Sequence, residues 1–266
     1  MPPPPIKIGA EVEEKAFPYE VEMPLVGHIE ELRGRIFKSL LFIVIGSAIS
    51  LVFIKPLIHL LQAPAGAIHF LQVSPGEFLF VSLKVAGYSG LTISLPFILF
   101  QILAFILPGL TKKERKLIAP AVAGSATLFL IGIFFAWSAL VPAALTFLIN
   151  YGADVVEPLW SIERYLDFVL LLILATGLAF QLPILQLLLG VLGIIKWDQM
   201  LSAWRFVVLS SALAGAVLTP STDPITMLLL TTAICILFFI GVGLVALSDE
   251  VKAKIPVSAD LHSNEK

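Results

Sequence analysis

Long stretches without a charged residue constrain this chain more than any other feature of its sequence. No Asp, Glu, Lys or Arg occurs within residues 117–153, 168–195 or 224–248. A helix needs about 20 apolar residues to cross a bilayer, and lipid offers the peptide backbone no hydrogen-bond partners. Of the 266 residues, 14% are charged and 58% are hydrophobic, whereas soluble domains carry about 25% charged residues. The sequence therefore predicts an all-α polytopic membrane protein.

Charge spacing and apolar length together predict a bundle of six transmembrane helices. Residues 56–76 also lack charge, but three prolines interrupt them, so we expect a structured interfacial loop and not a seventh span. The fifth helix is expected to be short and to form a tight hairpin with the sixth. The predicted helices cover about residues 36–54, 78–107, 117–148, 163–193, 202–218 and 224–247, within a membrane domain (23–248) flanked by a disordered tail (1–22) and a second tail (249–266).

The positions of lysine and arginine predict the orientation. With six spans and a cytoplasmic N-terminus, the cytoplasmic side holds all but three of the 17 basic residues. The three on the outside are Lys55, Lys84 and Arg164. Both termini are therefore expected in the cytoplasm.

The most charged stretch in the first half of the chain, VGHIEELRGRIF (26–37), directly precedes the first apolar run. We expect an amphipathic helix at the cytoplasmic surface, with His28, Glu31 and Arg35 on one face and Arg33 on another. Positive-inside charges and a simple i,i+4 pair between Glu31 and Arg35 explain part of this pattern. An anchoring helix, however, has no need of two consecutive glutamates beside an anionic membrane surface.

A second acidic residue, Glu114, stands among four basic residues in the loop LPGLTKKERKLIAP. It either compensates those charges or joins Glu31 in holding a ligand with two guanidinium groups. Carboxylate–guanidinium pairing is bidentate and lysine replaces arginine poorly in it, so the second interpretation specifies its ligand.

Several polar residues fall within the expected spans. Gln101, Gln181 and Gln186 either bond neighbouring helices or face a partner or cavity. Asp223, in the turn TPSTDP, has the position of an N-cap, with Pro224 at the first helical position. No sequence signature of an enzyme occurs, and the four histidines are scattered, so we expect neither catalysis nor a metal site or other cofactor. A net charge of −2 gives no indication of nucleic-acid binding.

Five segments together resemble the TatC family, the C component of the twin-arginine (Sec-independent) protein translocase. In order along residues 23–247 they are HIEELRGRIF, VSPGEFLFVSLK, LPFILFQILAFILPGLTKKERK, FQLPI and LTPSTDP. The resemblance implies a concave six-helix bundle with short helices 5 and 6 and cytoplasmic termini. It also implies binding of twin-arginine signal peptides on folded cargo, assembly with small single-span A/B-type subunits in a hetero- and homo-oligomer, and transport driven by the proton-motive force. The expected location is the plasma membrane or the thylakoid membrane.

Carried over by motif, the resemblance assigns signal-peptide binding to Glu31 and Glu114, with Arg33 and His28 in the same patch. Gln181 falls where many members carry Glu, at a position associated with partner contacts, and Gln101 is a further polar residue within a span. Asp223 matches an acid of the outer turn, and Glu77 matches an outer-face motif of structural role. Two alternatives stay open, a secondary transporter or channel for a small solute and a passive membrane scaffold.

Overall fold

The structure is a computed structural model that describes residues 25–66, 68–106, 118–151, 159–218 and 223–254. It is helical apart from one short parallel pairing of β1 (Phe70–Leu71) with β2 (Trp160–Ser161). The helical elements, in chain order, are α1 (Leu25–Val52), α2 (Ile54–Gln62), η1 (Ala63–Ala65), α3 (Glu77–Ile106), α4 (Ile118–Phe135), η4 (Ala136–Leu140), α5 (Val141–Tyr151), α6 (Ile162–Ala179), α7 (Leu182–Val191), α8 (Trp197–Ser202), α9 (Trp204–Leu218) and α10 (Pro224–Lys254).

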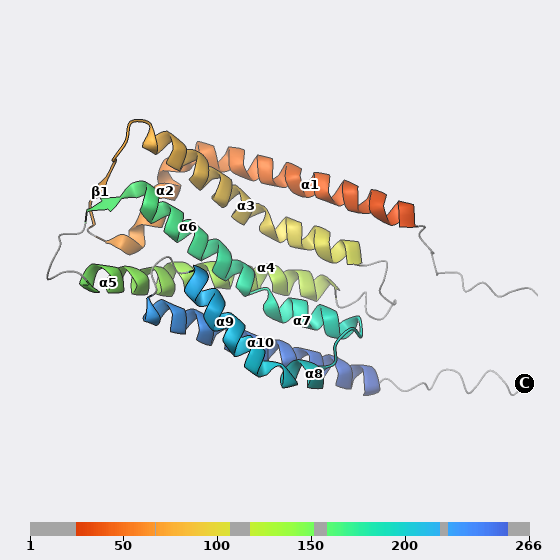
Figure 1. Cartoon of the computed structure of the whole chain (residues 1–266). Coiled ribbons are helices and arrows are strands. Elements are labelled where there is room, and N and C mark those ends of the chain that lie inside the picture. The colour runs from red at the N-terminus through yellow and green to blue at the C-terminus, as the bar shows by residue number, and fades with distance from the viewer. Residues whose placement is uncertain (1–24, 67, 107–117, 152–158, 219–222, 255–266) are drawn as a thin grey trace, which may run out of the picture.

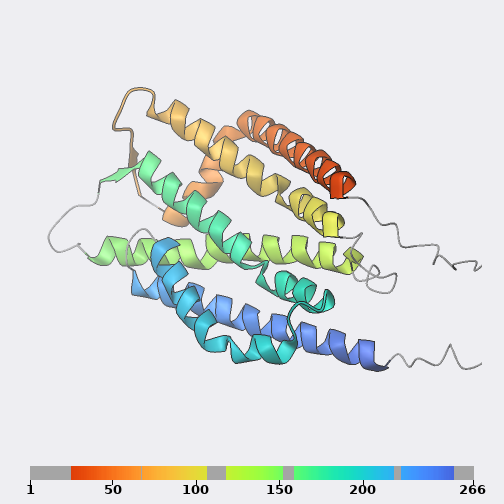
Figure 2. The ribbon, with the colours of Figure 1, turned by 45° about the vertical axis from the view of Figure 1, so that its right-hand side comes forward.

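The helices form a bundle in which α1 lies at one edge and α9 and α10 lie at the other (Figure 1). Between them, α3 packs on α1, α4 and α6, while α7 and α9 pack on α10. The start of α1 and the end of α10 lie at the same end of the bundle, which we call the terminal end (Figures 1 and 2). The two short strands lie at the opposite end, which we call the strand end.

The prediction of six membrane helices is confirmed. Five segments of the described chain are long and apolar enough to cross a bilayer, and a sixth, within α9, is shorter. The residues after the first span form α2, η1 and β1, so they add no seventh span. The fifth helix is short as expected, with 15 residues in α9.

The expectation that the sixth helix is short is wrong. The charge-free run 224–248 alone has 25 residues, and α10 continues through Asp249 to Lys254, which gives a helix of 31 residues. The amphipathic helix expected before the first span runs directly into it, so α1 is one continuous helix from Leu25. A charge marks where a span leaves lipid, but it does not end a helix.

Two prolines shape the third and fourth membrane helices. The fourth is divided into α6 and α7, with Phe180 and Gln181 between them. Pro183 lacks the N–H that would bond to the carbonyl of Ala179, and its ring crowds that carbonyl. In the third, the π-helical turn η4 precedes Pro142, and a wider turn relieves the same clash.

The main hydrophobic core lies toward the strand end, where α2, α3, η4, α5 and α6 meet. Tyr165 is 1% exposed, and its hydroxyl donates to the carbonyl of Leu61 over 2.6 Å. The indole of Trp137 donates to the carbonyl of Leu60 over 3.0 Å. These bonds satisfy the last carbonyls of α2 and fix α2 against the bundle.

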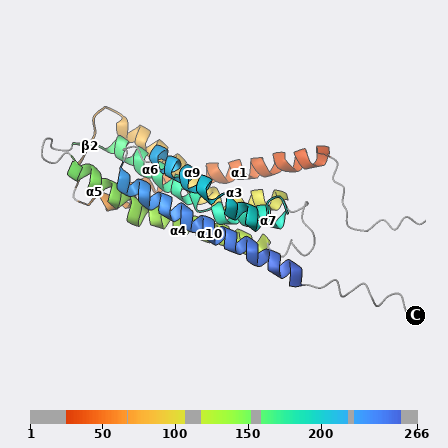
Figure 3. The same cartoon turned by 60° about the horizontal axis from the view of Figure 1, so that its bottom comes forward.

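Small residues bring α1 and α3 together along a single seam. A Cβ placed on Gly90 would lie 2.4 Å from the backbone nitrogen of Ser47, and one on Gly46 would lie 2.7 Å from the carbonyl oxygen of Gly90. The hydroxyl of Ser94 donates to the carbonyl of Phe42 over 2.7 Å. Only 11% of the membrane-spanning window of α1 is buried in the single chain. Its attachment therefore depends on close backbone approach to α3, and Figure 3 shows α1 at the edge of the bundle.

Candidate functional site

Three polar side chains from α1 and α3 meet at the terminal end, and we call them the Arg35 cluster (Glu31, Arg35 and Gln101). Arg35 donates two hydrogen bonds to Oε1 of Glu31, from Nε over 3.0 Å and from Nη2 over 2.6 Å. Its Nη1 donates to Oε1 of Gln101 over 3.1 Å. One guanidinium therefore joins a carboxylate of its own helix to an amide of the neighbouring helix.

Helix periodicity and one ring contact position this cluster. Residues 28, 31 and 35 follow each other at spacings of three and four, so they share the face of α1 that meets α3. The ring of His28 stacks on Phe105, with 4.2 Å between ring centroids. Because Phe105 lies in the last turn of α3, the stack fixes the start of α1 against the end of α3.

The carboxylate of Glu31 is only half used. Its second oxygen, Oε2, is buried and has no hydrogen-bond partner among the residues that the structure describes. The side chains of Glu31 and Arg35 are 23% and 21% exposed. A buried carboxylate oxygen without a donor is costly, so the site has an unmet capacity to accept an N–H group.

The other residues predicted to bind a signal peptide are placed less completely. Arg33 is exposed on α1, and its guanidinium carbon lies 5.7 Å from the centroid of the Phe37 ring. Glu114 lies outside the described residues. The joint action of Glu31 and Glu114 therefore stays a prediction.

Gln181 bonds two membrane helices in the single chain. Its Oε1 accepts from the hydroxyl of Ser125 over 2.6 Å, and its Nε2 donates to the carbonyl of the same residue over 3.1 Å. The side chain lies at the break between α6 and α7 and Ser125 lies in α4, so the pair joins α4 to the broken helix. Since Gln181 is 5% exposed, its amide is not presented to a partner in this state.

Gln186 differs, because neither Oε1 nor Nε2 of its buried amide has a partner within the described part of the chain. The side chain fits against α10, where a Cβ on Gly241 would lie 1.8 Å from Oε1 of Gln186. It also borders a cavity of about 560 Å³ between α7, α8, α9 and α10. The interpretation of the glutamines as bonds between helices thus fits Gln101 and Gln181, and it does not fit Gln186.

Asp223 has the capping role that its sequence position indicated. Its Oδ1 accepts from the backbone N–H of Ile225 over 2.9 Å, and its Oδ2 accepts from the hydroxyl of Thr226 over 2.7 Å. The residue is fully buried, and α10 begins at Pro224. Asp223 therefore fixes the start of the last helix.

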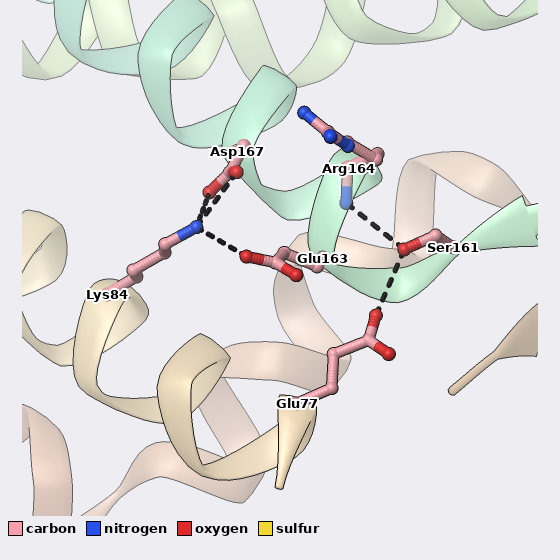
Figure 4. A network of polar contacts seen from close by, with 6 residues as sticks. All are labelled: Glu77, Lys84, Ser161, Glu163, Arg164 and Asp167. Carbon is pink, nitrogen blue, oxygen red and sulfur yellow. Dashed lines mark hydrogen bonds and ion pairs between the residues drawn. The ribbon is translucent and has the colours of Figure 1, made fainter. Parts of the chain in front are cut away.

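A second group of charged residues, at the strand end, was not predicted, and we call it the Lys84 cluster (Lys84, Glu163 and Asp167). The ammonium of Lys84, about two turns into α3, donates to Glu163 over 2.7 Å and to Asp167 over 3.0 Å. Figure 4 shows Lys84 reaching from α3 to both carboxylates on α6. The cluster joins these two helices near their strand ends.

Glu77 lies beside the Lys84 cluster and holds the short strands (Figure 4). One carboxylate oxygen accepts from the hydroxyl of Ser161 over 3.0 Å, and the other accepts from the backbone N–H groups of Val73 and Ser74. The residue is 3% exposed. These contacts agree with the structural role expected for Glu77.

The sequence carried a partial signal for the Lys84 cluster. Glu163 and Asp167 are spaced four residues apart and so share one face of a helix. Lys84 and Glu77 are spaced seven apart in α3 and so share one face as well. The predicted helices 78–107 and 163–193 already contained Lys84, Glu163 and Asp167, but spacing within each helix does not show that α3 and α6 pack together.

Comparisons with known proteins agree with this architecture. The family model described as "Sec-independent protein translocase protein (TatC)" matches residues 27–244. A "Sec-independent protein translocase protein TatC" from Synechocystis sp. is 57% identical over 230 residues, which cover 86% of this chain and 91% of the relative. A chloroplastic TATC of Oryza sativa subsp. japonica is 50% identical over 239 residues, which cover 88% of this chain and 66% of the relative.

A solved structure agrees as well. The crystal structure of a "Twin Arginine Translocase Receptor- TatC" superposes with a TM-score of 0.74 at 32% identity, and the match covers 84% of this chain and 99% of that chain. The family consists of translocase components and not enzymes, as expected for this chain. The family has cyanobacterial and chloroplast members. Together with the apolar helices of this chain, they place the chain in an inner or thylakoid membrane as a multi-pass protein. The chain therefore belongs to the TatC family and is a subunit of the twin-arginine, Sec-independent protein translocase.

Proposed function

We propose that this subunit is the receptor for twin-arginine signal peptides of folded cargo, and that the terminal end of its bundle faces the cytoplasm. The orientation rests on the excess of lysine and arginine at that side of the predicted spans. In this proposal the cargo crosses the membrane with energy from the proton-motive force. The comparisons lend no support to the alternative of a solute transporter.

One observation carries the receptor proposal, namely that Glu31 already binds a guanidinium. Arg35 reaches it through two N–H groups, which is the type of contact that an arginine of a signal peptide would make. The neighbouring helix α3 ends at Ile106, and the segment 107–117, which carries Glu114, follows directly. Two carboxylates at this end would match two consecutive arginines.

The expected binding energy combines charge with apolar contact. Each charge-assisted hydrogen bond contributes about 1.5–3 kcal/mol when it is partly shielded, and under about 1 kcal/mol when it is fully solvated. Glu31 is partly shielded, so its pair with an arginine falls between these limits. The apolar residues that follow the arginines in a signal peptide would add burial against the bundle.

We assign the docking of small single-span subunits to α9. An apolar row along this helix faces away from the bundle, comprising Phe206, Leu209, Leu213 and Val217, each at least 65% exposed. The neighbouring stretch SSALAGA (210–216) has small residues that allow close packing of a second helix. A role of Gln181 in partner contact stays a prediction, because Ser125 occupies its amide in the single chain.

Site-specific photocrosslinking tests the receptor proposal. A photoreactive residue in place of Leu32, which follows Glu31, or of Lys113, which precedes Glu114, lies beside a proposed carboxylate without replacing it. We expect both positions to crosslink to a two-arginine signal peptide and to lose the crosslink when lysines replace the arginines. The control is the same probe at Leu159, which is 81% exposed near β2. Crosslinking from Leu159 alone, or equal crosslinking of both peptides, would contradict the proposal.

A further inference from the structure

In the resting chain neither oxygen of the Glu31 carboxylate is open to an arginine from outside. Oε1 accepts both N–H groups of Arg35. Oε2 is shielded from solvent, although none of the described residues (25–66, 68–106, 118–151, 159–218 and 223–254) donates a hydrogen bond to it. A guanidinium that approaches from water therefore finds no free acceptor on Glu31 until the Arg35 cluster rearranges.

We propose that Arg35 is a resident guanidinium that occupies Glu31 until an arginine of the signal peptide exchanges with it. This inference rests on the proposed function, because it describes how that function is regulated at the same site. The exchange replaces one guanidinium by another on the same carboxylate. A ligand must therefore bind Glu31 at least as strongly as Arg35 does. An incoming cation that makes fewer or weaker hydrogen bonds to Glu31 does not displace Arg35.

The contrast between arginine and lysine follows from this minimum. A guanidinium presents paired N–H groups in one plane and matches the two bonds that Arg35 gives up. An ammonium is a compact, strongly hydrated charge and does not reproduce that pair. We infer that a two-lysine peptide leaves Arg35 in place and associates without contact to Glu31.

Gln101 holds Arg35 after Arg35 has left Glu31. Its amide oxygen accepts from Nη1 of Arg35 over 3.1 Å, on a different nitrogen from those that bind Glu31. When Glu31 is taken by the signal peptide, this bond to α3 still holds Arg35 near the site. A neutral acceptor holds the guanidinium less strongly than a carboxylate does, so Arg35 returns to Glu31 when the peptide leaves.

This arrangement differs from an ordinary pair on a helix surface. An exposed i,i+4 pair contributes only a few tenths of a kcal/mol and opens freely. Arg35 and Glu31 are about four-fifths buried, and the third partner comes from α3, 66 residues away in sequence. Displacing Arg35 therefore has a cost that the ligand must meet.

The test measures the affinity of the full-length protein in nanodiscs for two synthetic signal peptides that differ only in having two arginines or two lysines. In Arg35→Gln we expect the two-arginine peptide to bind roughly three- to tenfold more tightly than in Lys38→Gln. Lys38 is exposed on α1, so this control removes the same charge from the same helix. Equal or weaker binding in Arg35→Gln would overturn the inference, because Arg35 would then position Glu31 and not compete for it.

The two-lysine peptide provides a readout that a positioning role would not change. In the native chain, Glu31→Gln should leave its affinity unchanged. In the Arg35→Gln background, Glu31→Gln should lower it, because lysine then reaches the vacated carboxylate. If Glu31 has no effect on this peptide in either background, the inference is wrong.

A second substitution tests the same mechanism while Arg35 is present. Gln101→Leu leaves the displaced guanidinium without its acceptor on α3, whereas Arg35 keeps Glu31 before the exchange, so we expect weaker binding of the two-arginine peptide. The effect should vanish in Arg35→Gln, and a double-mutant cycle measures this coupling. Additive effects would overturn the inference.

Failure of the inference can be told apart from failure of the proposed function. If Glu31→Gln weakens the two-arginine peptide while Arg35→Gln and Lys38→Gln bind alike, the receptor site stands and the exchange is wrong. If Glu31→Gln leaves two-arginine binding unchanged, the proposed function at this site and the inference are both overturned.

Discussion

The two charged clusters on α3 use similar residues in opposite ways. At the strand end, the single ammonium of Lys84 meets two carboxylates of α6, and nearby Glu77 uses both its oxygens. At the terminal end, one guanidinium meets one carboxylate, and no described residue donates to the second oxygen of Glu31. A buried carboxylate whose two oxygens both accept hydrogen bonds, as in Glu77, indicates a structural joint, whereas the unpaired buried oxygen of Glu31 leaves capacity for a ligand.

The surrounding packing differs in the same direction. The strand end contains the main core, with α2, α3 and α6 fixed by the buried Tyr165 and its bond to Leu61. At the terminal end, α1 has its main contacts with α3, and its other faces are exposed in the single chain. A site that must admit a polypeptide thus lies on the less enclosed part of the fold, and the rigid part lies farthest from it.

The largest expected effect comes from breaking the seam that holds α1 against α3. Gly90→Val places side-chain atoms within about 2.5 Å of Ser47, which the backbone of α1 cannot accommodate without moving. We expect a loss of about 3 kcal/mol in the free energy of unfolding, measured by denaturant titration in detergent. Gly87→Val is the matched control, since a Cβ there meets nothing within 4 Å. Equal losses in both variants would show that the seam does not depend on close approach.

A smaller effect is expected from the strand end. Glu77→Gln turns one acceptor oxygen into an amide donor, so the N–H groups of Val73 and Ser74 or the hydroxyl of Ser161 lose their acceptor. We expect the midpoint of thermal unfolding to fall by several degrees while binding of the two-arginine peptide stays unchanged. Loss of peptide binding at native stability would contradict the division into a structural and a binding cluster.

The smallest effect is expected from Lys84→Met. It leaves Glu163 and Asp167 without their cation, but all three side chains are at least 37% exposed, so solvent screens the repulsion. We expect a slight fall in the thermal midpoint at low salt that shrinks at high salt. Lys55→Met, at an exposed lysine on α2, serves as control. A fall as large as that of Glu77→Gln would make the Lys84 cluster the main joint of the strand end.

The sequence predicted the membrane helices well because the signal is local. Charge-free runs of sufficient length specify spans whatever the neighbouring helices do. The same signal failed for α10, where the helix continues through charged residues in water. Pro183 and Pro142 were visible in the sequence. Whether a proline breaks the helix, as near Gln181, or widens one turn, as in η4, depends on how the neighbouring helices pack around it.

The candidate site was predictable only in part. Helix periodicity placed His28, Glu31 and Arg35 on one face, and the structure brings that face against α3. It could not reveal that Gln101 completes the cluster, because the two residues that bond are 66 positions apart. The ammonium of Lys84 likewise pairs with residues 79 and 83 positions away. Pairings of this kind depend on which helices pack together, and local patterns do not record that.

The most direct test of the central claim is the affinity of Glu31→Gln for the two-arginine peptide, measured beside Glu77→Gln in the same nanodiscs. A carboxamide keeps the shape of Glu31 but loses the negative charge and one acceptor, so we predict a loss of about tenfold. Glu77→Gln, which makes the same change at the strand end, should bind as the native chain does. Native affinity in Glu31→Gln, or an equal loss in both variants, would contradict the account.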